Sequence, residues 1–194
     1  MRSNLLKYLL TFTGAFLLFV IACNHNFQEK IPPKTVEGIL DLTNWNFKSD
    51  GVVDLSGEYE FYWKQHLTPQ EFAGPDLPQR TGYITVPGFW NNYELNGKKL
   101  KGDGYATYRL KIFLPEQREH LALKLLSLGT AYTLFLNGQK VSSVGIAGKD
   151  RETTVPRYFP QVLDCEVKAT QIELIFQVSN FHHRKGGAWE AIHL

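Results

Sequence analysis

The sequence predicts an all-β fold, an antiparallel β-sandwich of the jelly-roll type. Alternation of apolar and polar residues with a period of two dominates the chain, and no long stretch has the 3.6-residue period of a helix. Asn137-Gly138 lies between two such runs, and this dipeptide readily adopts the positive φ angles of a tight hairpin turn. Connections rich in Gly, Pro, Asn and Asp separate the runs at short intervals, which is typical of sandwiches and jelly rolls.

The individual strands follow from the alternation and its breaks. The aromatic run 57–63 places Tyr59, Phe61 and Trp63 on one strand face, which we expect to lie in the core. Thr68 and Pro69 have the residue types of a helix cap and a first helical position, so a helical turn is expected at 68–72. The expected strands are 57–63, 83–86, 106–114, 121–125, 131–136, 139–144 and 172–178.

The first 22 residues have the features of a secretory signal peptide. A basic start with Arg2 and Lys7 precedes 15 uncharged, mostly apolar residues, fewer than the roughly 20 that span a bilayer. Val20-Ile21-Ala22-Cys23 resembles the bacterial lipobox, and this resemblance implies that Cys23 becomes the lipidated first residue of a mature lipoprotein. The alternative is an ordinary cysteine that is cleaved off or left free. Lipidation predicts an exported protein, anchored to a membrane on the periplasmic or cell-surface side.

Residues 23–34 are predicted to form a flexible tether, and residues 35–194 a single domain. The segment after Cys23 is polar and contains Pro32-Pro33, which suits an unstructured linker. If Cys23 is lipidated, Cys165 has no partner in the chain, so the domain must be held together by core burial and not by a disulfide. The formal net charge of +2 includes two cations of the signal peptide, and no basic stripe is present, so nucleic acid is not expected as a partner.

The segment Ser179–Gly187, followed by Trp189, is the main candidate for ligand recognition. It places His182, His183 and Arg184 beside two glycines and an aromatic side chain, a combination suited to a small polar ligand. One alternative is a metal site, which is disfavoured because neighbouring residues of an extended strand point to opposite faces and no further ligand pattern accompanies them. The other alternative is a structural network that ties this loop to the sandwich.

The candidate site extends to Arg151, Glu152 and Trp90. Arg151 and Glu152 lie in a long loop, where an arginine can bind a ligand in a bidentate manner; equally, they can pair with other loop residues. Trp90 and Trp189 are candidate aromatic walls, with a place in the core as the alternative for each.

A catalytic function is not expected. Glu58 and Glu60 lie two apart on one strand face, a spacing that formally fits a pair of glycosidase carboxylates. Their alternation with Tyr59 and Phe61 instead indicates two solvent-facing side chains. No nucleophile elbow, phosphate-binding loop or zinc motif occurs elsewhere, and no cofactor is implied.

Several segments resemble known families. The sugar-binding jelly roll at the N-terminus of family 2 glycoside hydrolases is similar to the segments Leu55–Phe61, Val86–Trp90, Gly104–Arg109 and Leu134–Gly138. The chain from about Leu40 to Ile192 more closely resembles the extracytoplasmic sensor domain of bacterial seven-transmembrane receptors with diverse intracellular signalling modules. The segments that carry this closer resemblance are Arg151–Pro156, Pro160-Gln161 and Ser179–Gly187.

These resemblances imply a galactose-binding-like jelly roll that binds a carbohydrate or a related small polar ligand outside the membrane. In the glycoside hydrolases the chemistry resides in a separate barrel, which agrees with a noncatalytic module. The chain ends at Leu194, where the receptors continue into seven helices, so we expect a free-standing lipoprotein or the front piece of a longer receptor. The alternative function is a protein-interaction or structural module that docks on a membrane receptor.

Overall fold

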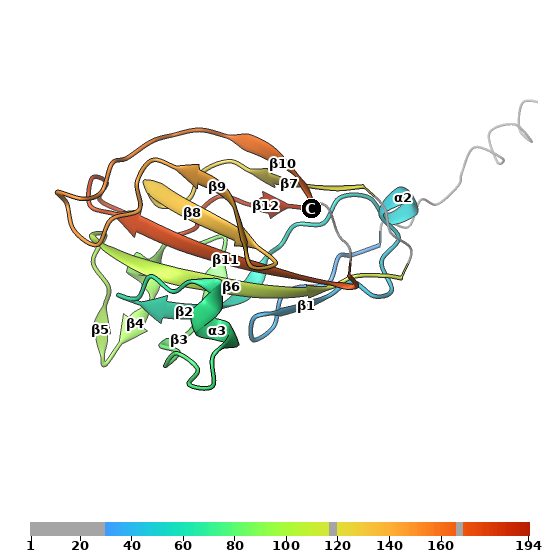
Figure 1. Ribbon diagram of the computed structural model, residues 1–194, viewed down its shortest axis with the longest axis horizontal. Coiled ribbons are helices and arrows are strands. Elements are labelled where there is room, and N and C mark those ends of the chain that lie inside the picture. The colour runs from blue at the N-terminus through green and yellow to red at the C-terminus, as the bar shows by residue number, and fades with distance from the viewer. Residues whose placement is uncertain (1–29, 117–119, 166–168) are drawn as a thin grey trace, which may run out of the picture. The chain divides into compact units, whose positions relative to one another are not determined.

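The computed structural model describes residues 30–116, 120–165 and 169–194. The predicted signal peptide and the lipidation site Cys23 lie outside these residues. The described part of Pro32–Leu194 forms one compact unit composed mainly of strands (Figure 1). The predicted antiparallel β-sandwich is confirmed.

The larger sheet has seven strands in the order β3-β2-β6-β11-β8-β9, with β1 added beside β6. Its centre is the antiparallel pair β6 and β11, which stay in register over ten residues, from Gly104 opposite Asn180 to Phe113 opposite Gln171. Only β1 pairs in parallel among these strands. The strands are β1 (Ile39–Asp41), β2 (Gly57–Trp63), β3 (Gly82–Val86), β6 (Gly104–Phe113), β8 (Ala131–Leu136), β9 (Gln139–Val144) and β11 (Gln171–Asn180).

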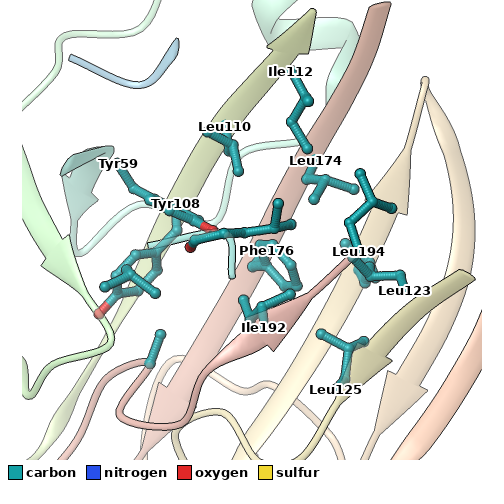
Figure 2. Close-up of a cluster of buried hydrophobic side chains, with 14 of the residues drawn as sticks. Tyr59, Tyr108, Leu110, Ile112, Leu123, Leu125, Leu174, Phe176, Ile192 and Leu194 are labelled. Atoms are coloured by element: carbon teal, nitrogen blue, oxygen red, sulfur yellow. The ribbon is translucent and has the colours of Figure 1, made fainter. Parts of the chain in front are cut away.

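The smaller sheet contains β10 (Gln161–Cys165), β7 (Leu121–Leu125) and β12 (Ile192–His193), in that order. Val53 and Leu55 extend it, because their N–H groups donate to the carbonyl oxygens of Leu194 and Ile192, each at 2.8 Å. Side chains from both sheets fill the space between them and form the main core (Figure 2). The labelled core residues in that view are Tyr59, Tyr108, Leu110, Ile112, Leu123, Leu125, Leu174, Phe176, Ile192 and Leu194.

Two predicted local signals are confirmed. Asn137 and Gly138 have φ angles of 47° and 84° and connect β8 to β9 in a hairpin. The expected helical turn is α3 (Pro69–Ala73), where the Glu71 carboxylate accepts a hydrogen bond of 2.7 Å from the N–H of Thr68. The remaining short elements are α2 (Phe47–Asp50), the 3₁₀ turn η1 (Trp90–Asn92) and the hairpin of β4 (Glu94–Leu95) and β5 (Lys98–Lys99).

The outer face of the larger sheet is also partly covered. Phe72 of α3 packs with Tyr62 and Ile175 in a second apolar cluster. Beside this cluster the Nε of Arg109 donates to Glu173 at 2.8 Å, and an Nη of Arg109 lies 3.3 Å from Glu60. The prediction of solvent exposure is therefore correct for Glu58 and wrong for Glu60, whose side chain is only 14% exposed because it pairs with Arg109.

Cys165, at the end of β10, is a buried free thiol, and burial raises its pKa. Among the described residues, no helix is both long enough and apolar enough to cross a membrane.

Candidate functional site

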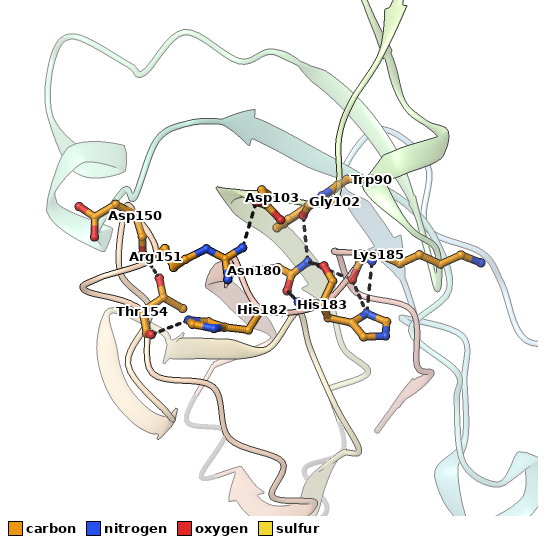
Figure 3. Close-up of polar contacts among 10 residues, drawn as sticks. All are labelled: Trp90, Gly102, Asp103, Asp150, Arg151, Thr154, Asn180, His182, His183 and Lys185. Atoms are coloured by element: carbon orange, nitrogen blue, oxygen red, sulfur yellow. Dashed lines mark hydrogen bonds and ion pairs between the residues drawn. The ribbon is translucent and has the colours of Figure 1, made fainter.

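Asn180 holds the predicted recognition segment in place at the end of β11. Its side chain is fully buried, and its Nδ2 lies 2.9, 2.7 and 3.0 Å from the carbonyl oxygens of Gly102, His183 and Lys185 (Figure 3). Its Oδ1 accepts a hydrogen bond of 3.0 Å from the N–H of His183. One amide thus satisfies several backbone groups of two loops, and the segment after β11 takes a fixed shape.

Trp90 forms the base beneath this segment and is completely buried. Its Nε1 donates to the Gly102 carbonyl oxygen at 3.0 Å, and Gly186 packs against its ring so closely that an added Cβ would lie 2.2 Å from a ring carbon. Trp90 is therefore a core residue and offers no surface to a ligand, so the core alternative is correct for this tryptophan.

The two histidines are held by backbone carbonyl oxygens, which can only accept hydrogen bonds. The Nε2 of His182 lies 3.1 Å from the Thr154 carbonyl oxygen, so Nε2 carries the proton (Figure 3). The Nδ1 of His183 lies 2.8 Å from the Lys185 carbonyl oxygen and 3.3 Å from the Lys185 nitrogen; the shorter contact requires Nδ1 to donate. In their neutral forms, His182 Nδ1 and His183 Nε2 then remain as acceptors.

Both histidines line an open groove with a volume of about 390 Å³. Trp189 forms an aromatic wall of this groove, and its indole is partly exposed. The complete lining consists of Ser127, Gly129, Thr130, Pro156, Arg157, Tyr158, His182, His183 and Trp189. We call this the Trp189 groove.

The other predicted site residues lie outside the Trp189 groove. Arg151 faces Asp103 at 3.4 Å, with more than half of each side chain exposed, which agrees with the alternative that it orders its loop (Figure 3). Glu152 is exposed, and Arg184 is exposed with its carbonyl oxygen accepting from Asn91 at 3.3 Å. The structure thus brings together His182, His183 and Trp189, but not Arg151, Glu152, Arg184 or Trp90.

Arg157 and Tyr158 of the groove were missed by the sequence interpretation. The N–H of Arg157 donates to the Thr130 carbonyl oxygen at 2.9 Å, which attaches this loop to the start of β8. The side chain of Tyr158 is 71% exposed and borders the groove. The signal available in the sequence was the run Arg157-Tyr158-Phe159, an arginine beside two aromatic residues in a loop.

A second groove adjoins the first at a row of rings. The centroid of the Trp189 ring lies 5.6 Å from that of the Phe89 ring and 5.8 Å from that of the His183 ring. Phe89 lines a further groove of about 370 Å³, together with Tyr83, Pro87 and Tyr93. We call this the Phe89 groove.

The loop that carries Arg151 is hydrogen-bonded to Ser179, which in turn contacts His66. The Ser179 hydroxyl donates to the Gly148 carbonyl oxygen at 2.6 Å and lies 3.2 Å from Nε2 of His66. Burial lowers the pKa of His66 to about 4, so the imidazole is neutral at pH 7. Because the Ser179 hydroxyl is fully buried and donates to a carbonyl oxygen, the pair braces the loop and does not form an accessible nucleophile.

Within the described ranges, no three His, Cys, Asp or Glu side chains lie close enough together to hold a metal ion. Glu58 and Glu60 have structural partners: Glu58 accepts from the N–H of Glu37 at 3.3 Å, and Glu60 pairs with Arg109.

No family model matches the sequence, and no curated protein resembles it significantly. Solved structures do share its fold. A Ruminococcus gnavus β-glucuronidase structure aligns with a TM-score of 0.55 at 14% identity, covering 73% of this chain and 27% of that chain. The same TM-score is found for β-glucuronidase from that organism in complex with uronic deoxynojirimycin, at 13% identity, and in complex with D-glucuronic acid, at 14% identity; each alignment covers 73% of this chain and 28% of the other. This chain therefore has the fold of a part, under a third, of these β-glucuronidase chains.

Proposed function

We propose that the chain is a noncatalytic carbohydrate-binding module and that the Trp189 groove is its binding site. The observation that carries this proposal is a partly exposed indole in an open groove, bordered by hydrogen-bonding groups in fixed positions. Carbohydrate sites combine these two features, since an aromatic plane covers the apolar face of a sugar ring and placed polar groups orient its hydroxyls. The fold shared with part of a glucuronide-cleaving enzyme agrees with this role.

The polar groups of the groove suit hydroxyl groups. His182 Nδ1 and His183 Nε2 can each accept from a sugar hydroxyl, because the other ring nitrogen donates to a backbone carbonyl. Arg157, Tyr158 and Ser127, which also line the groove, carry further donors. A polyhydroxylated sugar ring would find both kinds of partner there.

Binding without catalysis is supported by the absence of acidic groups from this lining. Glycoside hydrolysis usually requires a pair of carboxylates that flank the scissile bond. None of the residues that line the Trp189 groove is Asp or Glu.

We expect Trp189→Ala to weaken sugar binding at least tenfold, because the stacking surface is lost. A glycan array followed by thermal shift of the purified domain measures this, since a ligand raises the melting temperature by mass action. Arg151→Ala is the matched control, because Arg151 lies in a neighbouring loop but not in the groove, and it should leave binding unchanged. If no glycan binds, or if Trp189→Ala binds as well as the parent, the proposal fails.

At the level of the cell, we infer that the module is exported and held at a membrane through Cys23, where it serves a sensing system. This rests on the lipobox-like sequence and on the resemblance to receptor sensor domains. Membrane fractionation of the full chain checks the anchor: Cys23→Ala should move the protein from the detergent-soluble membrane fraction to the aqueous fraction. An unchanged distribution would contradict lipidation at this residue.

A further inference from the structure

The Trp189 groove and the Phe89 groove share an electrostatic property: neither is lined by a carboxylate. Between them the two linings contain an arginine and two histidines, together with aromatic and small residues. Neutral-sugar sites commonly use Asp or Glu to accept hydroxyl protons, because a carboxylate is the strongest acceptor available in proteins. The absence of that acceptor from both linings raises the question of which charge these grooves favour.

Cations without carboxylate partners lie beside the grooves. The Nζ of Lys185 is 4.4 Å from the centroid of the Phe89 ring, and the guanidinium of Arg157 is 5.3 Å from that of Phe159. Neither forms an ion pair within the described part of the chain. By comparison, Arg109 has two carboxylate partners and Arg151 has one.

The nearby acidic residues of the described ranges form no ion pair with these two cations. Asp103 is the partner of Arg151, and Asp150 accepts from the N–H of Thr153 at 2.7 Å. Glu190 follows Trp189 in the chain but does not line either groove. Within the described residues, Arg157 and Lys185 thus lie beside the two grooves without an ion-pair partner.

We propose that the two grooves together bind an acidic oligosaccharide, one that bears carboxylate or sulfate groups. Sugar rings occupy the Phe89 and Trp189 positions, and their acidic groups lie near Lys185 and Arg157. Two partly exposed rings 5.6 Å apart give a stacking surface larger than one sugar needs, so the ligand is longer than a monosaccharide. This inference rests on the proposed carbohydrate-binding function and specifies the class of ligand.

The test compares glycans that differ only in charge. Oligogalacturonate and its methyl ester form one matched pair, and a chondroitin sulfate oligosaccharide and its desulfated form a second. Calorimetry with the purified domain should give, for at least one pair, a Kd about tenfold lower for the more acidic member. We expect Arg157→Ala and Lys185→Ala each to raise that Kd about three- to fivefold, as for exposed ion pairs. Arg151→Ala, a cation of the neighbouring loop, should leave it unchanged.

Salt and chain length give two further readouts. Raising the salt from about 50 to 500 mM should weaken binding of the acidic member, because exposed charges are screened. A monosaccharide acid should bind at least tenfold more weakly than the oligomer if both rings are used. Polyglutamate serves as a polyanion without sugar rings and should not bind.

The outcomes separate the two proposals. Binding that depends on Trp189 but is equal for the more acidic and the less acidic member of both pairs overturns the acidic ligand and leaves the carbohydrate-binding function intact. Binding of polyglutamate that equals that of the acidic glycans, or an unchanged Kd in Arg157→Ala and Lys185→Ala, also overturns it. No binding of any glycan contradicts both.

Discussion

Asn180→Ala should lower the free energy of unfolding by about 3 kcal/mol, because it removes the hydrogen bonds by which one buried amide joins two loops. The alanine cannot donate to the carbonyl oxygens of His183 and Lys185, nor accept from the N–H of His183. Urea denaturation followed by circular dichroism measures this loss.

The substitution should also disturb the Trp189 groove, because this amide bonds the carbonyl oxygens of His183 and Lys185 and the N–H of His183 in the loop that borders the groove. Asn180→Asp is the sharper variant: its size is unchanged, but a carboxylate would face three carbonyl oxygens within 3.0 Å and should destabilise as well. Asn92→Ala, an exposed asparagine in η1, serves as the matched control and should change stability by less than about 0.5 kcal/mol. A loss below about 1 kcal/mol for Asn180→Ala would show that the loop has other supports.

Acid should destabilise the domain well before its carboxylates protonate. His66 has its pKa lowered to about 4 by burial, against 6.5 in the unfolded chain, so unfolding takes up a proton. Its contribution to stability is present above pH 6.5 and is lost as the pH falls toward 4. From these two pKa values, unfolding should become easier by about 2 kcal/mol between pH 7 and pH 5.

Urea melts at several pH values check this slope, and His66→Gln should flatten it, because the amide does not titrate. The control is His120→Gln, the same substitution at an exposed histidine. The lowered carboxyl pKa values of Asp41 and Asp150, caused by hydrogen bonds from Thr43 and Thr153, act only below about pH 4 and so leave this window undisturbed. An unchanged slope in His66→Gln would mean that His66 is solvated.

The fold was predictable where the sequence contains strong local signals. The alternation in 106–114 and 172–178 indicated the central strands β6 and β11, and Asn137-Gly138 indicated the hairpin of β8 and β9. Short strands such as β1, β10 and β12 were missed, because two to five residues give too little alternation to detect. Their positions depend on tertiary pairing with β6 and β7.

The candidate site was predictable only in part, because its geometry depends on contacts between distant loops. The sequence indicated Ser179–Gly187 and Trp189, and His182 and His183 do line the groove with that tryptophan. It could not show that Asn180 would bind the loop of Gly102, or that Arg157 would take the position expected for Arg151. The residue types indicated the chemistry of the candidate site, whereas tertiary contacts between distant loops determine which partner each arginine has.

Similarly, Glu60 could not be identified as a partly buried residue from the alternation of its strand. A period of two distinguishes the two faces but does not say whether the outer face is open. Here α3 and Arg109 cover the outer face. To predict this cover, one would need to know where the loop 64–81 lies and that a cation stands on the adjacent strand.

The packing of Gly186 on the Trp90 ring has a consequence for how the molecule associates with a ligand. The loop that borders the groove rests directly on a fully buried side chain, so its shape is maintained by the core in the absence of any ligand. Because the loop is already ordered, ligand binding loses little conformational entropy of this loop. We therefore expect fast binding with little movement of the backbone. Such a site selects among ligands by shape as well as by charge. A partner protein would therefore recognise the ligand-bound module by its altered surface, and not by a loop that closes over the ligand.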